Sequence, residues 1–593
     1  MTKNFWPDTT RVEHEGFTLD IAKAAIRNIT YQGSQIIDLL YTAIRPVDWS
    51  TLEATEHFEE INNSGENCII KITDIFNEGL KATSIITLKS NGRFNIAYEL
   101  VGSVETKLNR WGICFCLNSA DWIGATISYA ESKFVLSNDI SPQVFINGIT
   151  QGLFPAANEM KFEARDGRSI FAKSSGKVLE AEDQRNWTDN SYKIYSGSLS
   201  EPLPIAIAVG HKFTQEIEFE LTSQQGQIVD GSKILVKEID SLPRIGVQFN
   251  AESTLTNEDL DRALTILDID HIRINEESLT TQKMAFISSH GLLLEAALLS
   301  SHSEEELGYE IEHLSARVPA GSRLLVQREG RQLVEAKDLP KNNSLNSIIP
   351  GTDGYLVDLH RDKRDFGNSV SYSITPSVHT SDLESIFKTL QTQSKTIEFA
   401  KRRIAPQVSI SPITLSTRGN PETGHLRENR NNFSQPDLAG RIKTIEAASW
   451  TLGSIFALAS ADAFSGTWHE LFGEFGIIYS ENGATKFSTT FHALAALGAH
   501  HAHEITIATC VDQSWVGFED RESGKMIVAS KRPWNIKISE KVLAGYKSMQ
   551  SLRADDCEKA SQIMDWWSYS EISAISSEFP LALTPFEIAL LRR

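Results

Sequence analysis

Short segments of alternating apolar and polar residues, broken by turn residues, fill the chain from its start to about residue 240. Examples are IITLKSNGRFNIAYEL and TQEIEFELTSQQGQIVDGSKILVKEI, in which SNG at 90–92 and VDG at 229–231 are hairpin-type turns. Many short alternating strands joined in this way are typical of an antiparallel sandwich. The pattern therefore predicts an N-terminal β-sandwich domain over residues 1–242.

After Pro243 the pattern changes to short apolar runs separated by longer segments of helical period, which favours βα units around a parallel sheet. Eight runs follow one another: RIGVQF from Arg244, HIRIN from His271, LLLEAAL from Leu292, RLLVQR from Arg323, DGYLVDL from Asp353, SVSYSI from Ser369, QVSIS from Gln407 and FSGTWHE from Phe464. Eight strands with their helices match a (β/α)₈ barrel, whose typical length is roughly 250 residues. We predict such a barrel over residues 243–500.

From about residue 501 the runs EITIATC, WVGFED, KMIVAS and EIALLRR again indicate short strands, so a small β-domain over residues 501–593 is expected to close the chain. The predicted fold class is a multidomain α/β plus β protein. In it, a (β/α)₈ TIM-like barrel is flanked by N-terminal and C-terminal β-sandwich domains.

Composition narrows the possible partners. The chain has 57 Lys and Arg against 77 Asp and Glu, a formal charge of −20, which repels phosphate backbones and anionic membranes. The first residues lack a secretory signal, and no stretch approaches the roughly 18 apolar residues of a membrane span. We expect a soluble cytoplasmic protein that binds neither nucleic acid nor membrane. Its five cysteines contain no CxxC pair, and Cys114 and Cys116 are interpreted as small buried hydrophobic residues.

Several common catalytic motifs are missing from the sequence: GxSxG, GxGxxG, GxxxxGK[ST] and HExxH. The stretch GAHHAHE, with His500, His501 and His503, offers imidazoles, but no acidic ligand stands at metal-site spacing. We therefore expect no metal and no cofactor.

In a barrel the chemistry lies at the C-terminal ends of the strands and in the loops that follow. The polar residues expected there are Arg273, Asn275, Asp358, Arg361, Tyr372, His379, Arg418, Asn420 and Glu470. Any one of them taken alone is as well explained by a salt bridge or a rim hydrogen bond. Glu470 differs, because it ends a strand of otherwise small and aromatic residues and should face the barrel mouth.

A dense polar cluster lies outside the barrel, in LEAEDQRNWTDNSYKIY at 179–195. Strand alternation puts Glu182, Gln184 and Asn186 on one face and Asp183, Arg185 and Trp187 on the other, so neither face is a simple apolar core. We interpret the segment as a binding surface. The alternative is a structural network of ion pairs.

The same segment carries a family resemblance. EDQRNWTDNSYKIY, from Glu182, resembles the central motif of the D-apionate lactonase family. Further segments agree in order: RPVDWSTLEA from Arg45, GTDGYLVDLHR from Gly351, YSITPSVHTSD from Tyr372, SPITLSTRGNP from Ser411 and SWTLGSIFALASADA from Ser449. The chain departs from the family pattern at Asp358, His360, Thr375 and His469, and the segment WGICFCLNSADW after Asn109 and Arg110 lacks the family's His-Pro. The resemblance fades in the last hundred residues or so.

The resemblance implies hydrolysis of a sugar lactone, D-apionolactone, to the aldonic acid in the catabolism of a branched pentose. It also implies a glycosidase-like barrel flanked by β-sandwiches. Lactone hydrolysis needs a base for water and donors for the oxyanion. The expected catalytic residues are Glu470 as first choice of base, Asp358 as second, and His379 as a hydrogen-bond donor. The expected substrate-binding residues are Glu182, Asp183, Arg185, Asn186, Trp187, Tyr372 and Arg418.

Two other functions remain open. A glycoside hydrolase needs paired carboxylates, roughly 5 to 9.5 Å apart. Glu329 follows the fourth run, but no carboxylate follows the seventh before Glu422. A non-catalytic carbohydrate-binding protein is the third alternative. In each case the expected partner is a small carbohydrate, and the sequence indicates no oligomeric state.

Overall fold

The structure is a computed structural model. It describes the chain except residues 1–7, 24, 51, 53, 144, 147–148, 224–230, 250, 254, 330–332, 341–345, 362–363, 381, 419–437, 499–503 and 576–580. The chain divides into two compact units. The first comprises residues 1–228 with residues 382–384, and the second comprises the rest. Within the described residues, no helix has the length and apolar character needed to cross a membrane.

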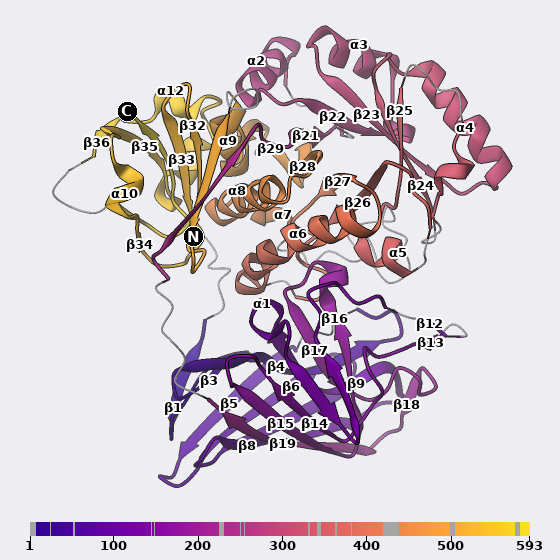
Figure 1. Cartoon of the computed structure of the whole chain (residues 1–593), viewed down its shortest axis with the longest axis vertical. Helices are drawn as coiled ribbons and strands as arrows, with labels where there is room; N and C mark the ends of the chain where they lie inside the picture. Colours follow the sequence, from indigo (N-terminus) through magenta and orange to yellow (C-terminus); the bar gives the residue numbers. More distant parts are fainter. Residues whose placement is uncertain are drawn as a thin grey trace. The chain divides into compact units, whose positions relative to one another are not determined.

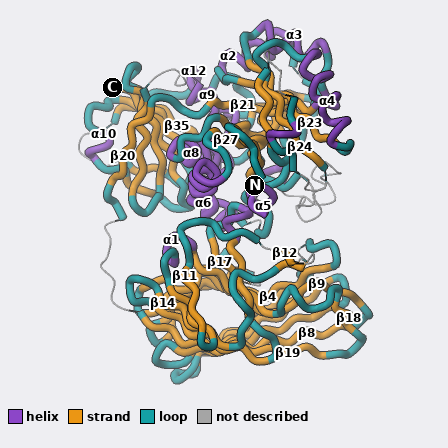
Figure 2. Tube along the Cα trace, turned by 45° about the vertical axis from the view of Figure 1, so that its right-hand side comes forward, coloured by secondary structure: helices purple, strands orange, loops and turns teal. Residues whose placement is uncertain are grey.

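The first unit is built mainly from two large antiparallel sheets (Figure 1), with a further two-stranded sheet of β12, Phe145–Ile146, and β13, Ile149–Thr150. One has the order β1-β2-β3-β4-β9-β17-β16, with β18 paired to β9: β1 Thr10–His14, β2 Phe17–Ala22, β3 Ala25–Tyr31, β4 Ser34–Pro46, β9 Thr106–Asn118, β16 Leu179–Asp183, β17 Ser191–Ser196 and β18 Ile205–Ile207. The other has the order β11-β10-β14-β15-β19-β8-β7-β6-β5: β5 Glu56–Asn63, β6 Cys68–Phe76, β7 Leu80–Leu88, β8 Arg93–Gly102, β10 Thr126–Tyr129, β11 Ser132–Val135, β14 Glu159–Glu163, β15 Ser169–Ser175 and β19 Lys212–Thr222. Figure 2 shows strands throughout this unit and the short helix α1, Ser119–Trp122.

The inward faces of the two sheets meet in one apolar core. Phe115 of β9 lies 5.3 Å from Phe219 of β19, ring centre to ring centre, and Phe17 of β2 lies 5.9 Å from Phe94 of β8. These contacts confirm the predicted N-terminal sandwich. The SNG turn joins β7 to β8, with Asn91 in the left-handed region at φ 57°. The VDG turn falls partly outside the described residues.

The second unit contains the barrel. Among the described residues its parallel strands have the order β25-β24-β23-β22-β21-β28-β27-β26, and a bridge between Gly351 and Ser371 joins the two ends of this order. The strands are β21 Arg244–Gln248, β22 His271–Asn275, β23 Leu293–Ser300, β24 Arg323–Arg328, β25 Ser347–Pro350, β26 Ser369–Ile374, β27 Gln407–Ile413 and β28 Ser465–Phe472. The predicted TIM-like barrel is thereby confirmed.

Helices follow most of these strands, as Figure 1 shows for α3 and α4 outside β23 and β24. They are α2 Asn257–Leu267, α3 Thr281–Ser289, α4 Glu304–Arg317, α5 Leu356–Arg361, α6 Leu383–Arg403, α7 Leu438–Arg441, α8 Ile445–Ser460 and α9 Thr489–Leu497. After β28 the chain adds β29, Gly476–Glu481, and β30, Ala484–Phe487.

The prediction for the fifth barrel strand was wrong. The strand is β25, and DGYLVDL forms a turn at Asp353 and Gly354 followed by helix α5. Tyr355, Leu356 and Val357 are all buried, and a short continuous apolar run of this kind fits a buried strand and a buried helix equally well. Asp353 therefore stands at the C-terminal end of the fifth strand, whereas Asp358 lies on the helix.

The C-terminal sheet has the order β20-β31-β32-β33-β38-β35-β36: β20 Ile234–Ile239, β31 Ile505–Cys510, β32 Trp515–Asp520, β33 Lys525–Ser530, β35 Ser548–Leu552, β36 Ser573–Ala574 and β38 Ile588–Arg592. Strand β20 was expected in the N-terminal sandwich, but it pairs with β31. The alternation of apolar and polar residues identifies a strand, but it does not show which strand lies beside it, because paired strands can be far apart in the sequence. Helix α8 lies against this sheet, where the Ser449 hydroxyl donates to the Ser530 carbonyl at 2.6 Å.

Candidate active site

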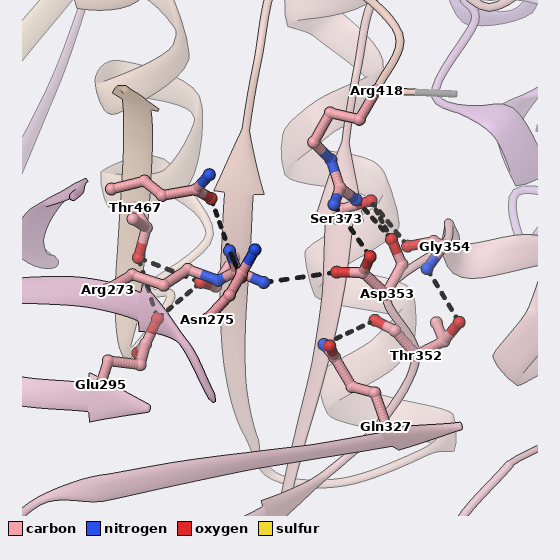
Figure 3. Close-up of polar contacts among 12 residues, drawn as sticks. Arg273, Asn275, Glu295, Gln327, Thr352, Asp353, Gly354, Ser373, Arg418 and Thr467 are labelled. Carbon is pink, nitrogen blue, oxygen red and sulfur yellow. Dashed lines mark hydrogen bonds and ion pairs between the residues drawn. The ribbon is translucent and has the colours of Figure 1, made fainter. Parts of the chain in front are cut away.

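Polar side chains gather at the C-terminal end of the barrel strands (Figure 3). Arg273 of β22 is fully buried. Its Nη1 donates to Oε1 of Gln248 at 2.5 Å and to Oδ1 of Asn275 at 2.8 Å, and its Nη2 reaches Oδ1 of Asp353 at 3.3 Å. Arg273 and Asn275 therefore lie where the sequence placed them, on the inner side of β22 near its end.

A second guanidinium shares the same carboxylate. Nη1 of Arg418 donates to Oδ2 of Asp353 at 2.9 Å, and Nη2 donates to the Asp353 carbonyl at 2.5 Å. Figure 3 shows both arginines directed at Asp353. The Ser373 hydroxyl of β26 donates to the carbonyls of Asp353 and Gly354, which ties the loop after β25 to its neighbour. Two guanidiniums therefore share one carboxylate at this end of the barrel.

A buried carboxylate lies deeper in the barrel. Glu295 of β23 accepts from the hydroxyls of Ser411 at 2.5 Å and Thr467 at 3.0 Å, and it pairs with Arg323 at 3.1 Å. Burial raises the pKa of Glu295, but Arg323 and His271 outweigh that effect and hold the pKa below its usual value. Glu295 is fully buried and belongs to the barrel interior.

Glu470 is half-buried near the C-terminal end of β28, two residues before Phe472, the last residue of the strand. It stands in register with Gln248 of β21, whose side chain accepts from Arg273 inside the barrel. Neighbouring residues in register on parallel strands point to the same side of a sheet, so Glu470 faces the barrel interior. An added Cβ at Gly473, in the loop beyond, would lie 4.0 Å from Oε2 of Glu470.

Asp358 was expected to project from the end of a barrel strand, but the structure places it elsewhere. It is buried on α5, where it accepts from the Thr352 hydroxyl at 3.3 Å and pairs with Arg361 at 3.3 Å. These bonds place it behind the loop that carries Asp353. His379 is half-buried in the loop after β26.

Tyr372 faces away from the mouth. Its hydroxyl donates to Oγ1 of Thr396 on α6 at 3.1 Å, while Ser371 and Ser373 occupy the inner positions of β26. The expectation that Tyr372 supplies a phenolic donor to a ligand is therefore wrong. Successive side chains of a strand point to opposite faces, so the inward direction of Ser371 and Ser373 implies that Tyr372 between them points outward.

The EDQRNWTD segment is not an extended strand throughout. Strand β16 ends at Asp183, and residues Gln184–Trp187 form a 3₁₀ helix, η1, so the expected alternation of faces breaks at this point. Arg185 is 1% exposed, and its Nε and Nη2 contact both carboxylate oxygens of Asp183 at 2.8 and 2.7 Å. Asn186 donates to the Ser141 carbonyl at 2.6 Å.

Arg185 also reaches three backbone carbonyls, those of Ser137, Asn138 and Asp139, at 3.0 to 3.2 Å. This agrees with the alternative interpretation, a structural network, for Asp183, Arg185 and Asn186. Glu182 pairs with Lys193 at 3.2 Å. Together with Trp187 and Tyr195 it lines a cavity of about 10 Å³, enough for one water molecule.

Sequence reasoning missed Asp353, Gln248 and the deep Glu295. The signal for Asp353 is the Asp-Gly pair shortly after Pro350, which indicates a turn rather than a strand. Within the described ranges no group of three histidine, cysteine or acidic residues could hold a metal ion. His500, His501, His503, Asn420 and Glu422 lie outside those ranges.

Family models match both parts of the chain. The model for "D-apionate lactonase, N-terminal domain" matches residues 1–224, and the model for "D-apionate lactonase, TIM barrel domain" matches residues 345–502. A curated D-apionate lactonase of Brucella anthropi is 22% identical over 541 residues, which cover 81% of this chain and 86% of that protein.

Solved structures also resemble parts of the chain. AbfB, a family 51 α-L-arabinofuranosidase from Bifidobacterium longum, has 9% identity and a TM-score of 0.39, covering 60% of this chain and 97% of that one. A putative aldose 1-epimerase from Escherichia coli K12 has 9% identity and a TM-score of 0.26, covering 37% of this chain and 99% of that one. The two family models together match more than half of the sequence, and the chain belongs to the D-apionate lactonase family.

Proposed function

We propose that this protein is a lactonase that opens a sugar lactone, D-apionolactone or a related aldonolactone, to its aldonic acid. The observation that carries the proposal is the convergence of Arg273 and Arg418 on Asp353 in a barrel mouth that also receives Glu470. Family membership supports the same reaction class.

Glu470 is the proposed general base. Its carboxylate takes a proton from water, and the water oxygen forms a bond to the lactone carbonyl carbon. The tetrahedral intermediate then collapses, the bond from that carbon to the ring oxygen breaks, and the proton held by Glu470 passes to the ring oxygen. Asp358 is the second choice, because its contacts to Thr352 and Arg361 already occupy it.

The guanidiniums supply the electrostatic part of the mechanism. Negative charge develops on the carbonyl oxygen during attack, and donors fixed in advance stabilise it most effectively in a site sheltered from water. Asp353 holds Arg418 and Arg273 in place, so that both guanidiniums are fixed before a ligand binds. We propose Arg418 as the donor to the oxyanion and His379 as a donor to the carbonyl or a hydroxyl of the sugar.

In the N-terminal unit, we propose different roles for members of the EDQRNWTD segment. Glu182, the half-buried member of the segment, and Trp187 are the candidates for contact with a hydroxylated ligand. The cavity that both residues line has room for a water molecule and not for a sugar. Asp183, Arg185 and Asn186 hold the neighbouring backbone.

The test is turnover of a panel of aldonolactones by the purified chain, followed with a pH indicator because the acid formed releases a proton. We expect hydrolysis of five-membered sugar lactones and a loss of about 100-fold or more in kcat for Glu470→Gln, with folding intact. Cleavage of aryl glycosides without lactone opening would assign glycosidase activity instead. Sugar binding with no turnover of either substrate class would indicate a binding protein.

A further inference from the structure

Strand β28 carries a β-bulge directly before Glu470. Gly246 of β21 pairs with Thr467, and Gln248 pairs with Glu470, so two steps along β21 face three along β28. The extra residue lies in a stretch where His469 has a φ of 55°, in the left-handed region that few residues other than glycine adopt. A bulge of this kind changes the direction of the side chains that follow it.

Two consecutive side chains of the bulge point to the same neighbour. The Trp468 indole donates to the Ser454 hydroxyl at 3.1 Å, and Nε2 of His469 lies 2.9 Å from the Thr451 hydroxyl oxygen. Both acceptors lie on α8, one turn apart. In a regular strand adjacent side chains point to opposite faces, so the bulge is what directs both toward the helix.

The direction of the histidine hydrogen bond follows from its neighbour. The Thr451 hydroxyl donates its proton to the Ala447 carbonyl at 2.8 Å, so its oxygen accepts from Nε2–H of His469. Burial lowers the pKa of His469 to about 3, which keeps the ring neutral in this bond.

The direction of the Glu470 side chain follows from the alternation of faces along a strand. Thr467 faces the interior, where its hydroxyl donates to Glu295. Three residues further on, a regular strand would turn its side chain toward α8. The bulge adds one residue and returns Glu470 to the interior, level with Gln248.

We propose that His469 is a positioning residue for the lactonase reaction: its left-handed backbone and its bond to Thr451 hold the bulge that aims Glu470 into the barrel. The inference rests on the proposed function, since it takes Glu470 as the base. His469 itself donates no proton to the substrate and contacts helix α8.

Three variants of the full chain test this. His469→Val introduces a β-branched side chain that disfavours positive φ and removes the donor. Thr451→Val removes only the acceptor, and His469→Asn tolerates the left-handed region and keeps a donor. We expect kcat to fall about 100-fold in His469→Val, less in Thr451→Val and least in His469→Asn, while KM stays within about threefold, because small displacements of a catalytic group act on the chemical step.

The pH profile separates positioning from stability. The acidic limb of the kcat profile reports the essential base of the enzyme–substrate complex. It should shift in His469→Val and Thr451→Val, whereas a loss of folded protein alone does not move it. His492 of α9 offers a matched control, since it is also a buried histidine and its Nε2 bonds to the Ala560 carbonyl at 3.0 Å. His492→Asn should lower thermal stability and leave kcat and its pH limb unchanged.

The outcomes are distinguishable. If Glu470→Gln keeps the wild-type rate, the assignment of the base is wrong and the positioning role falls with it. If Glu470→Gln is inactive while His469→Val and Thr451→Val keep the wild-type kcat and pH limb, the proposed function stands and the positioning role alone is refuted. Should His469→Val fail to fold, Thr451→Val and His469→Asn still decide between these results.

Discussion

At the scale of single residues, the Arg185 guanidinium holds two segments of the N-terminal sandwich together. It binds both oxygens of Asp183 and the carbonyls of Ser137, Asn138 and Asp139, and it is almost completely buried. Removing it leaves the Asp183 carboxylate buried without its cation. We expect Arg185→Ala to destabilise the fold by about 3–5 kcal/mol, the usual cost of breaking a buried pair by removing one partner.

Thermal or urea unfolding of the purified variant measures this cost. Arg11 provides the control, because it is paired with Glu13 on the exposed surface, and Arg11→Ala should cost at most about 1 kcal/mol. If Arg185→Ala unfolds like the wild type but loses lactone turnover, Arg185 serves a ligand and not the fold.

At the scale of elements, β21 depends on a close approach to β22. A Cβ placed on Gly246 would lie 2.2 Å from Nε2 of His271, so only glycine leaves room for the imidazole inside the barrel. His271 in turn bonds to Thr467 at 2.8 Å, so a displaced ring disturbs the contacts around Glu295. Gly246→Ala should therefore destabilise by about 1–3 kcal/mol through overpacking.

A second glycine gives the matched comparison for that variant. Gly308 lies within α4, and a Cβ placed on it would meet nothing within 4 Å. Gly308→Ala should stabilise the protein by about 0.5–1 kcal/mol, because alanine is the better helix former. Equal unfolding temperatures for the two alanine variants would contradict the steric argument.

At the scale of the whole molecule, buried histidines make stability depend on pH. Burial lowers the pKa of His469 to about 3 and that of His492 to about 4. Between these values and the ordinary pKa near 6.5, the unfolded chain binds protons that the folded chain does not. Stability should therefore fall as the pH drops from about 6.5 towards 4, before most carboxylates titrate.

Glu295 adds a second step at lower pH. The fold lowers the pKa of Glu295. The ionised Glu295 therefore contributes its full stabilisation at pH values above its pKa in the unfolded chain. That stabilisation is lost as the pH falls through the lower pKa of the folded chain. Unfolding temperatures measured between pH 8 and pH 4 test the first step. His492→Asn should flatten that profile, and a wild-type profile that is level from pH 6.5 to 4.5 would contradict it.

Local patterns in the sequence determined most of the elements and several site residues. Alternation and helical period identify the sandwich strands and, among others, the barrel strands β22 and β28, because the apolar positions of a strand or helix follow its own geometry. The positions of Arg273, Asn275 and Glu470 near the ends of their strands follow from the same patterns, since strand ends define the barrel mouth. The role of Glu470 stays a prediction. The lactonase family resemblance was carried by contiguous motifs, which need no fold to be recognised.

Only the tertiary structure decided the remainder. The pairing of β20 with β31, the helix at Leu356–Arg361 and the sharing of Asp353 by two arginines depend on segments far apart in the chain. The inward direction of Glu470 depends on a bulge held by α8, and simple alternation in the sequence does not contain that extra residue. Contacts between distant segments depend on the packing of the whole barrel, and the hydrophobic periodicity of a single segment carries no information about them.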